Sequence, residues 1–88
     1  MQRPEIPERI WNNVCGAVIN ELDVQRKKKG DHSLLSTHEI FGVVQEEVLE
    51  LAQAVQANDL QSIRNELLDI AVSAILGIAS IDNESLHW

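Results

Sequence analysis

Apolar side chains recur at helical spacing along most of this chain, and the first such run lies near its N-terminus. It comprises four residues at intervals of four: Ile10, Val14, Val18 and Leu22. Pro7 precedes the run, and proline is tolerated in the first turn of a helix. Gly30 follows it and suits a helix end, because glycine adopts left-handed backbone conformations freely. The pattern predicts a first helix over about residues 6–27, with a loop over residues 29–36.

Two further amphipathic segments follow, and each begins with a residue that can cap a helix. Ser36 followed by Glu39 is the spacing of a capping box, which predicts a second helix over about residues 37–57. Its apolar positions include Ile40, Val44, Leu51 and Val55. Asp59 comes directly after a turn and can cap a third helix over about residues 60–81. The chain therefore reads as all-α, a helical hairpin preceded by one N-terminal helix.

The second half of the third helix, residues 70–81, is apolar nearly all round. A helix without a polar face is buried on every side. Three helices of this length cannot enclose it within one subunit, so the pattern predicts that it lies at a subunit interface. With 88 residues the chain makes one small domain, spanning residues 1–88, and small domains commonly gain stability by oligomerisation.

Composition narrows the possible partners and the compartment. The net charge of −7 disfavours direct binding to nucleic acid or to an anionic membrane. Residues 70–81 are too few to span a bilayer, and the N-terminus carries no signal-peptide pattern. The single cysteine, Cys15, excludes an intramolecular disulfide and falls on the apolar stripe, so we expect it in the core. These features predict a cytoplasmic protein.

Two acidic motifs carry the candidate chemistry, one on the second helix and one on the third. The first is Glu-Glu-x-x-Glu at Glu46, Glu47 and Glu50, and the second is Glu-x-x-Asp at Glu66 and Asp69. Residues three apart on a helix share a face. If the two helices pair antiparallel, four carboxylates converge, and they cannot all stay ionised without a cation or shared protons. Hard oxygen ligands of this kind suit Mg²⁺ or Mn²⁺.

The alternative interpretation, a solvated acidic face, is disfavoured by the distribution of charge. Six of the seven Lys and Arg residues lie at or before Lys29, and Arg64 is the one cation after it. Glu46 and Glu50 form a like-charge pair four residues apart, which destabilises a helix. Acidic side chains in an apolar segment are costly unless they are paired or bind a metal.

The ordered pair of acidic motifs on adjacent helices resembles the signature of the all-α NTP pyrophosphatases, the MazG-like superfamily. Fifteen residues separate Glu50 from Glu66, which is similar to the family's spacing, and the resemblance covers roughly residues 25–82. It implies a Mg²⁺-dependent enzyme that hydrolyses nucleoside or deoxynucleoside triphosphates to the monophosphate and pyrophosphate. It also implies a homodimer or homotetramer with a core of the four-helix-bundle type.

Carried over to the matching positions, the resemblance implies that four residues bind the metal: Glu47, Glu50, Glu66 and Asp69. Glu46 would be an auxiliary acid that orients a water or a second ion, and with Glu47 it makes up the predicted catalytic pair. This chemistry fits the residue types independently. A metal neutralises phosphate oxygens, and a carboxylate beside it can accept a proton from water.

Four residues are weaker candidates for substrate binding. Lys29 could reach the phosphates from the loop, and His38, at the start of the second helix, could contact phosphate or base. Trp11 could stack on a nucleobase and Asn12 could hydrogen-bond to it, although Trp11 also fits a core or interface position. A purely structural role is the alternative: a solvated helix end for Lys29, and a capping or surface position for His38.

Two alternatives stay open at this stage. Relatives carry cationic residues after the second motif, where this chain has none, so a non-catalytic dimerisation or nucleotide- and metal-binding module is the second interpretation. A ferritin-like di-iron bundle is the third, but it requires Glu-x-x-His on two helices. The chain offers that spacing only at Glu84 and His87.

Overall fold

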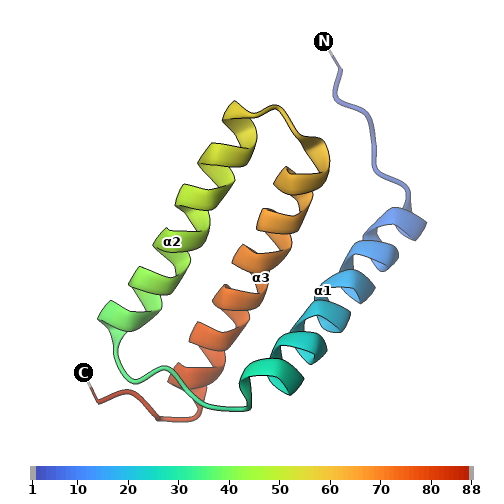
Figure 1. Cartoon of the computed structure of the whole chain (residues 1–88). Coiled ribbons are helices and arrows are strands. Elements are labelled where there is room, and N and C mark those ends of the chain that lie inside the picture. The colour runs from blue at the N-terminus through green and yellow to red at the C-terminus, as the bar shows by residue number, and fades with distance from the viewer. Residues whose placement is uncertain (1, 88) are drawn as a thin grey trace.

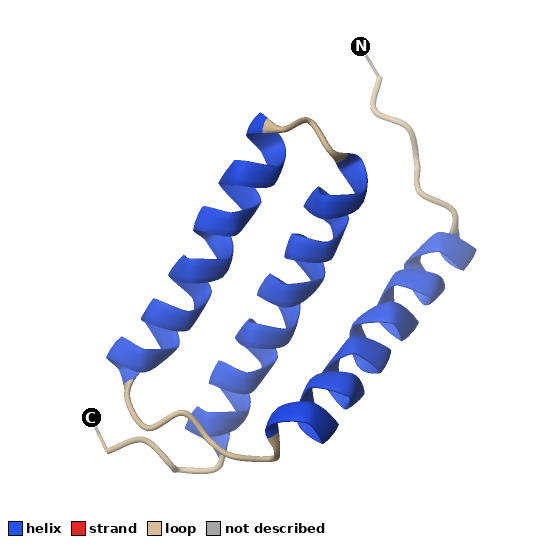
Figure 2. Ribbon diagram, viewed as in Figure 1, coloured by secondary structure: helices blue, strands red, loops and turns tan. Residues whose placement is uncertain are grey.

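The computed structural model describes residues 2–87 and contains three α-helices and no strand within that range (Figures 1 and 2). The helices are α1 (Glu8–Lys29), α2 (Thr37–Gln56) and α3 (Leu60–Asp82). This confirms the all-α prediction. α2 and α3 end within one residue of their predicted bounds, whereas α1 starts and ends two residues later than predicted. Lys29 is therefore the last residue of a helix and not part of the loop.

Local capping explains where the helices begin and end. The backbone N–H of Glu39 donates to the Ser36 hydroxyl oxygen at 3.0 Å, and the Glu39 carboxylate accepts from the Leu35 N–H at 3.1 Å. The Asp59 carboxylate accepts from the Gln61 and Ser62 amides at 3.1 and 3.3 Å. Both predicted caps are confirmed.

Gly30 terminates α1, as its position after the apolar run suggested, although the helix itself ends two residues later than predicted. Gly30 has φ +89°, a backbone conformation that L side chains rarely adopt, and its N–H donates to the Arg26 carbonyl at 2.8 Å. The Arg26 guanidinium then pairs with Asp31 in the following loop at 2.6 Å. Arg26 thereby connects the last turn of α1 to the loop that follows it.

The three helices form an open layer with α3 in the middle. α2 runs antiparallel to α3 on one side, and α1 lies on the other side of α3 (Figure 1). α1 packs on α3 and makes no packing contact with α2. The buried set among the described residues is correspondingly small: Ser36, Ala54, Val72, Ser73, Gly77 and Ser80.

Two small residues on α3, Gly77 and Ser80, allow α2 and the loop before it to pack closely against this helix. A Cβ added at Gly77 would lie 3.1 Å from a methyl carbon of Ile40, so glycine allows α2 and α3 to approach closely. Ser80 donates to the Leu76 carbonyl at 2.8 Å and accepts from the Leu34 N–H at 3.0 Å. This serine fastens the loop before α2 onto α3.

Apolar side chains remain exposed on all three helices of the single chain. Ile78 and Ile81, in the segment predicted to be buried on every side, are 59% and 54% exposed. Cys15 is exposed, so its predicted core position was wrong, and Trp11 is half-exposed near the start of α1. In α1 the half-buried apolar side chains are those of Ile10, Ala17, Val18 and Leu22, whereas Ile19 is exposed. No described helix combines the length and apolarity needed to cross a bilayer.

Candidate metal centre

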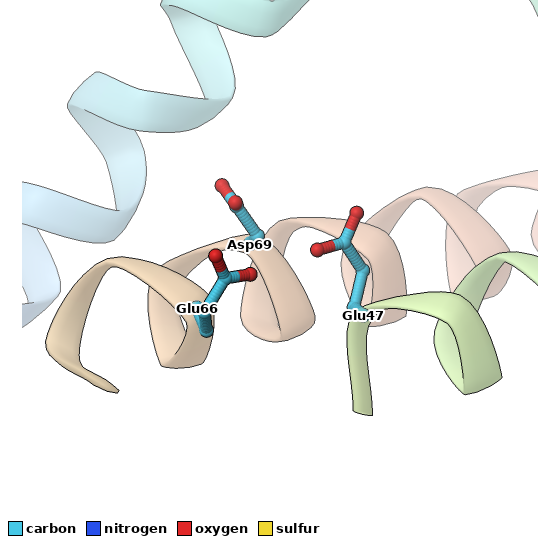
Figure 3. A group of neighbouring side chains, drawn as sticks. All are labelled: Glu47, Glu66 and Asp69. Carbon is cyan, nitrogen blue, oxygen red and sulfur yellow. The ribbon is translucent and has the colours of Figure 1, made fainter. Parts of the chain in front are cut away.

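Three carboxylates from the two acidic motifs converge between α2 and α3. One oxygen each of Glu47, Glu66 and Asp69 lies within 4.8 Å of the other two (Figure 3). Glu47 comes from α2 and the other two from α3, and the antiparallel pairing of the helices brings them together. All three side chains are half-buried. The convergence predicted from helical spacing is therefore present for these three residues.

The cluster holds oxygen atoms that lack partners. Glu47 Oε2 and Glu66 Oε2 are buried and accept no hydrogen bond within the described part of the chain. A buried charged oxygen without a donor is costly, because its lost hydration is not replaced. These atoms therefore call for a proton or a cation from outside the chain.

Glu47 shows the strongest electrostatic effect of this crowding. Burial, followed by the negative charges of Glu50 and Asp69, raises the pKa of the Glu47 carboxyl from 4.5 to about 7. A carboxyl with a pKa near neutrality is poised between holding a proton and accepting one. Groups perturbed in this way gather at functional sites, where clustered like charges and burial are retained for chemistry.

The two α3 acids are perturbed in the same direction. Burial, and then the neighbouring Glu50 carboxylate, raises the pKa of Glu66. Burial and then the charge of Glu21 raise the pKa of Asp69, and the Lys29 cation partly offsets this rise. All three carboxyls therefore hold protons more tightly than free ones, and a bound cation would compete with those protons.

The donor set fits a hard divalent cation. It consists of carboxylate oxygens from two helices, two of them without partners, and contains no nearby thiol or imidazole. Mg²⁺ and Mn²⁺ prefer such oxygen ligands and commonly use few carboxylates plus water and substrate phosphate. The residues that would hold the cation are Glu47, Glu66 and Asp69.

The other two acids of the motifs lie beside this group. Glu50 is half-buried one turn after Glu47, and its carboxylate lies close enough to those of Glu47 and Glu66 to raise the pKa of both, although it is not one of the three mutually close groups. Glu46 is exposed on α2. Glu50 is thus a neighbour of the cluster, and Glu46 faces solvent.

A pocket of about 150 Å³ adjoins the cluster and brings in α1. Its lining comprises Gln25, Lys29, Val43, Glu47, Asp69, Val72, Ser73 and Leu76. Lys29, a predicted substrate-binding residue, is therefore placed at the site. Glu21 and Gln25 reach the same region but were not predicted. Their signal was available, since Glu21, Gln25 and Lys29 recur every four residues and make a polar stripe along α1.

The remaining predicted substrate-binding residues lie elsewhere in the chain. His38 is exposed in the first turn of α2, nine residues before Glu47, which corresponds to about 13 Å along the helix. Trp11 and Asn12 are exposed in the second turn of α1, about 15 Å along the axis from Glu21. Within one subunit these three residues are not brought to the cluster.

The geometry defines an all-helical protein with a candidate divalent-metal centre. Searches against protein-family models, curated proteins and solved structures found no match to this chain. The functional interpretation therefore rests on the motifs and on the arrangement of the described side chains.

Proposed function

We propose that this protein is a Mg²⁺-dependent nucleoside or deoxynucleoside triphosphate pyrophosphohydrolase, which releases the monophosphate and pyrophosphate. One observation carries the proposal: Glu47, Glu66 and Asp69, from the two motifs of the resemblance, converge with buried oxygens that lack partners. A polyanionic substrate approaches such a cluster only together with cations, and a triphosphate normally carries Mg²⁺. Mn²⁺ is the natural substitute.

The chain's own residues supply the remaining requirements of the reaction. A bound divalent cation neutralises phosphate oxygens and lowers the pKa of water. Glu47, beside the cation, would accept the proton that the attacking water loses as the α–β phosphoanhydride bond breaks. Lys29 lines the pocket, and we assign to it the contact with the phosphates. Glu50 and Glu46 are proposed as an additional metal ligand and an auxiliary acid.

The exposed apolar residues support a homodimer as the working assembly. On α2, Phe41, Val48 and Val55 recur every seven residues and are each more than two-fifths exposed. On α3, Leu67 and Ile78 lie on one stripe. Val48 directly follows Glu47, and Leu67 directly follows Glu66. Because the two helices run antiparallel, one step beyond each of these facing acids leads to the same side of the hairpin, so both stripes lie on that side. Two hairpins joined through these stripes would form a four-helix bundle.

Substitution of the clustered acids tests the catalytic proposal. Asp69→Asn and Glu66→Gln keep the side-chain shape but remove charge, and we expect each to lower Mg²⁺-dependent pyrophosphate release by about 100-fold or more. Asp23→Asn, at an exposed position on α1, is the matched control and should keep full activity. Circular dichroism confirms that each variant is folded. Full activity in Asp69→Asn would refute the proposed role of the cluster.

The second candidate function is a non-catalytic module that binds nucleotide and metal. The observation that favours it is the shortage of cations, because Lys29 is the one Lys or Arg residue among the pocket's lining residues. Such a module would bind Mg²⁺ and nucleotide without releasing pyrophosphate. Product analysis separates the two candidates, since turnover beyond one equivalent excludes the second.

A further inference from the structure

Gln25 on α1 presents a second kind of unpartnered oxygen to the same pocket. Its Oε1 atom is buried and accepts no hydrogen bond within the described residues, and Gln25 lines the pocket together with Glu47 and Asp69. An amide oxygen is a neutral hard donor, a ligand type that Mg²⁺ and Mn²⁺ accept beside carboxylates. Neither acidic motif includes this residue.

The orientation of the amide is fixed by Glu21, one turn earlier on α1. Gln25 Nε2 donates to Glu21 Oε1 at 2.9 Å. The reversed amide would set its carbonyl oxygen against a carboxylate, two acceptors without a proton between them. Glu21 therefore holds the Gln25 nitrogen, and the Gln25 oxygen is left as the acceptor.

An acceptor in an acidic pocket has few possible partners. The nearby carboxylates are themselves acceptors when ionised, and Lys29 makes no hydrogen bond to Gln25 Oε1. Leaving the oxygen buried and unpaired costs free energy, on the order of 1–3 kcal/mol for such a group. A cation, or a water that the cation orients, would satisfy it.

We infer that Gln25 is a further oxygen ligand of the cation proposed above, directly or through one water, and that Glu21 is the positioning residue that orients its amide. The inference rests on the proposed metal centre. With Gln25 included, the metal site draws its ligands from all three helices instead of from α2 and α3 alone. Since α1 makes no packing contact with α2, the bound cation would be a link between them.

Mn²⁺ binding to the full chain, followed by the electron paramagnetic resonance signal of free Mn²⁺, tests this inference without reference to turnover. Gln25→Met keeps the length of the side chain and removes the amide, and we expect it to weaken Mn²⁺ binding about tenfold or more. Gln25→Glu keeps an oxygen and should bind at least as tightly as Gln25→Met. Gln45→Met, at an exposed position on α2, is the matched control and should bind like the unaltered protein.

The outcomes separate this inference from the proposed function. If the unaltered protein binds Mn²⁺ and folded Gln25→Met binds it equally well, the role of Gln25 is wrong and the carboxylate site stands. If Asp69→Asn abolishes binding while Gln25→Met and Gln45→Met weaken it equally, the role of Gln25 is again overturned. If the unaltered protein binds no Mn²⁺, both the metal centre and this inference fail.

Discussion

Glu47 is the residue whose ionisation is most strongly opposed by its surroundings. Its carboxyl lies among three other acids of the two motifs, and burial holds its pKa at about 7, well above the ordinary 4.5. A residue that served stability alone would be neutral or paired. The structure instead keeps an acid that the unliganded protein can ionise only at a cost.

The first prediction concerns the pH dependence of stability in EDTA. Because the folded-state pKa of Glu47 is raised, the folded protein binds more protons than the unfolded chain between about pH 4.5 and 7. The stabilising effect of the protonated carboxyl is full below the unfolded pKa and is lost as pH rises through 7. Urea unfolding should therefore give a lower free energy of unfolding at pH 8 than at pH 5.

Glu47→Gln separates this effect from other titrations. The amide cannot ionise, so the variant should lose less stability than the unaltered protein between pH 5 and pH 8. Glu46→Gln, which changes the exposed neighbouring acid, is the matched control and should keep the original pH dependence. An identical pH dependence in the unaltered protein and in Glu47→Gln would contradict the assigned environment of Glu47.

The second prediction concerns the pH dependence of metal binding. A cation must displace the protons held by carboxyls of raised pKa, so its affinity should rise as pH passes upward through about 7 and then level off. The rise should approach about tenfold per pH unit for each proton displaced. Mn²⁺ titrations between about pH 5.5 and 8.5, a range that brackets the Glu47 pKa, measure this rise. An affinity independent of pH would place the metal away from these carboxyls.

Among the helices, the close packing of α2 against α3 is what forms the site, because it brings Glu47 next to Glu66 and Asp69. Gly77 sets this approach, with Ile40 3.1 Å from where a Cβ would stand. Gly42 on α2, by contrast, has nothing within 4 Å of such a Cβ. The two glycines therefore form a matched pair for testing the helix interface.

The third prediction is that Gly77→Val destabilises the protein by about 1–3 kcal/mol, because the larger side chain pushes α3 away from α2. Gly42→Val should change stability by less than about 0.5 kcal/mol, since valine meets open space and has the better helix propensity. Urea unfolding measures both. Gly77→Val should also weaken Mn²⁺ binding, and equal stabilities of the two variants would show that the approach at Gly77 is not tight.

The elements were largely predictable from sequence, because their signals are local. Ser36 and Asp59 cap the helices that they were expected to cap, since each side chain accepts from a backbone amide two or three residues further on. The contribution of α1 was not predictable in the same way. Whether Glu21 and Gln25 face the acids or solvent depends on how α1 lies across α3, a choice that no local pattern of the sequence fixes.

The packing of α1 also decides which of its apolar residues stay exposed, and the sequence did not predict this. Periodicity placed Cys15 on an apolar stripe, but α1 contacts only α3, so a narrower face than expected turns inward and Cys15 stays exposed. The acids were predicted better. Spacing predicted that four carboxylates converge, those of Glu47, Glu50, Glu66 and Asp69, and all but Glu50 form the group of mutually close oxygens. This much was predictable because the short turn between α2 and α3 makes the two helices pair antiparallel.

At the scale of the whole molecule, the open layer of three helices leaves apolar surface that a second copy would cover. The fourth prediction follows: light scattering on the purified protein should give at least a dimer. Ile78→Glu should shift it toward the monomer, because a charge would be buried in the interface. Ile19→Glu, at a similarly exposed isoleucine on the outer side of α1, is the control and should leave the assembly unchanged. A monomeric unaltered protein would contradict the proposed bundle.

The central claim is that the acidic cluster performs Mg²⁺-dependent hydrolysis of nucleoside triphosphates. The most direct measurement is product analysis of a panel of the common NTPs and dNTPs incubated with the protein, once with Mg²⁺ and once with EDTA. We expect at least one nucleotide to yield equal amounts of monophosphate and pyrophosphate with Mg²⁺ and none with EDTA. A folded protein that binds Mg²⁺ but releases no pyrophosphate from any of them would contradict the claim.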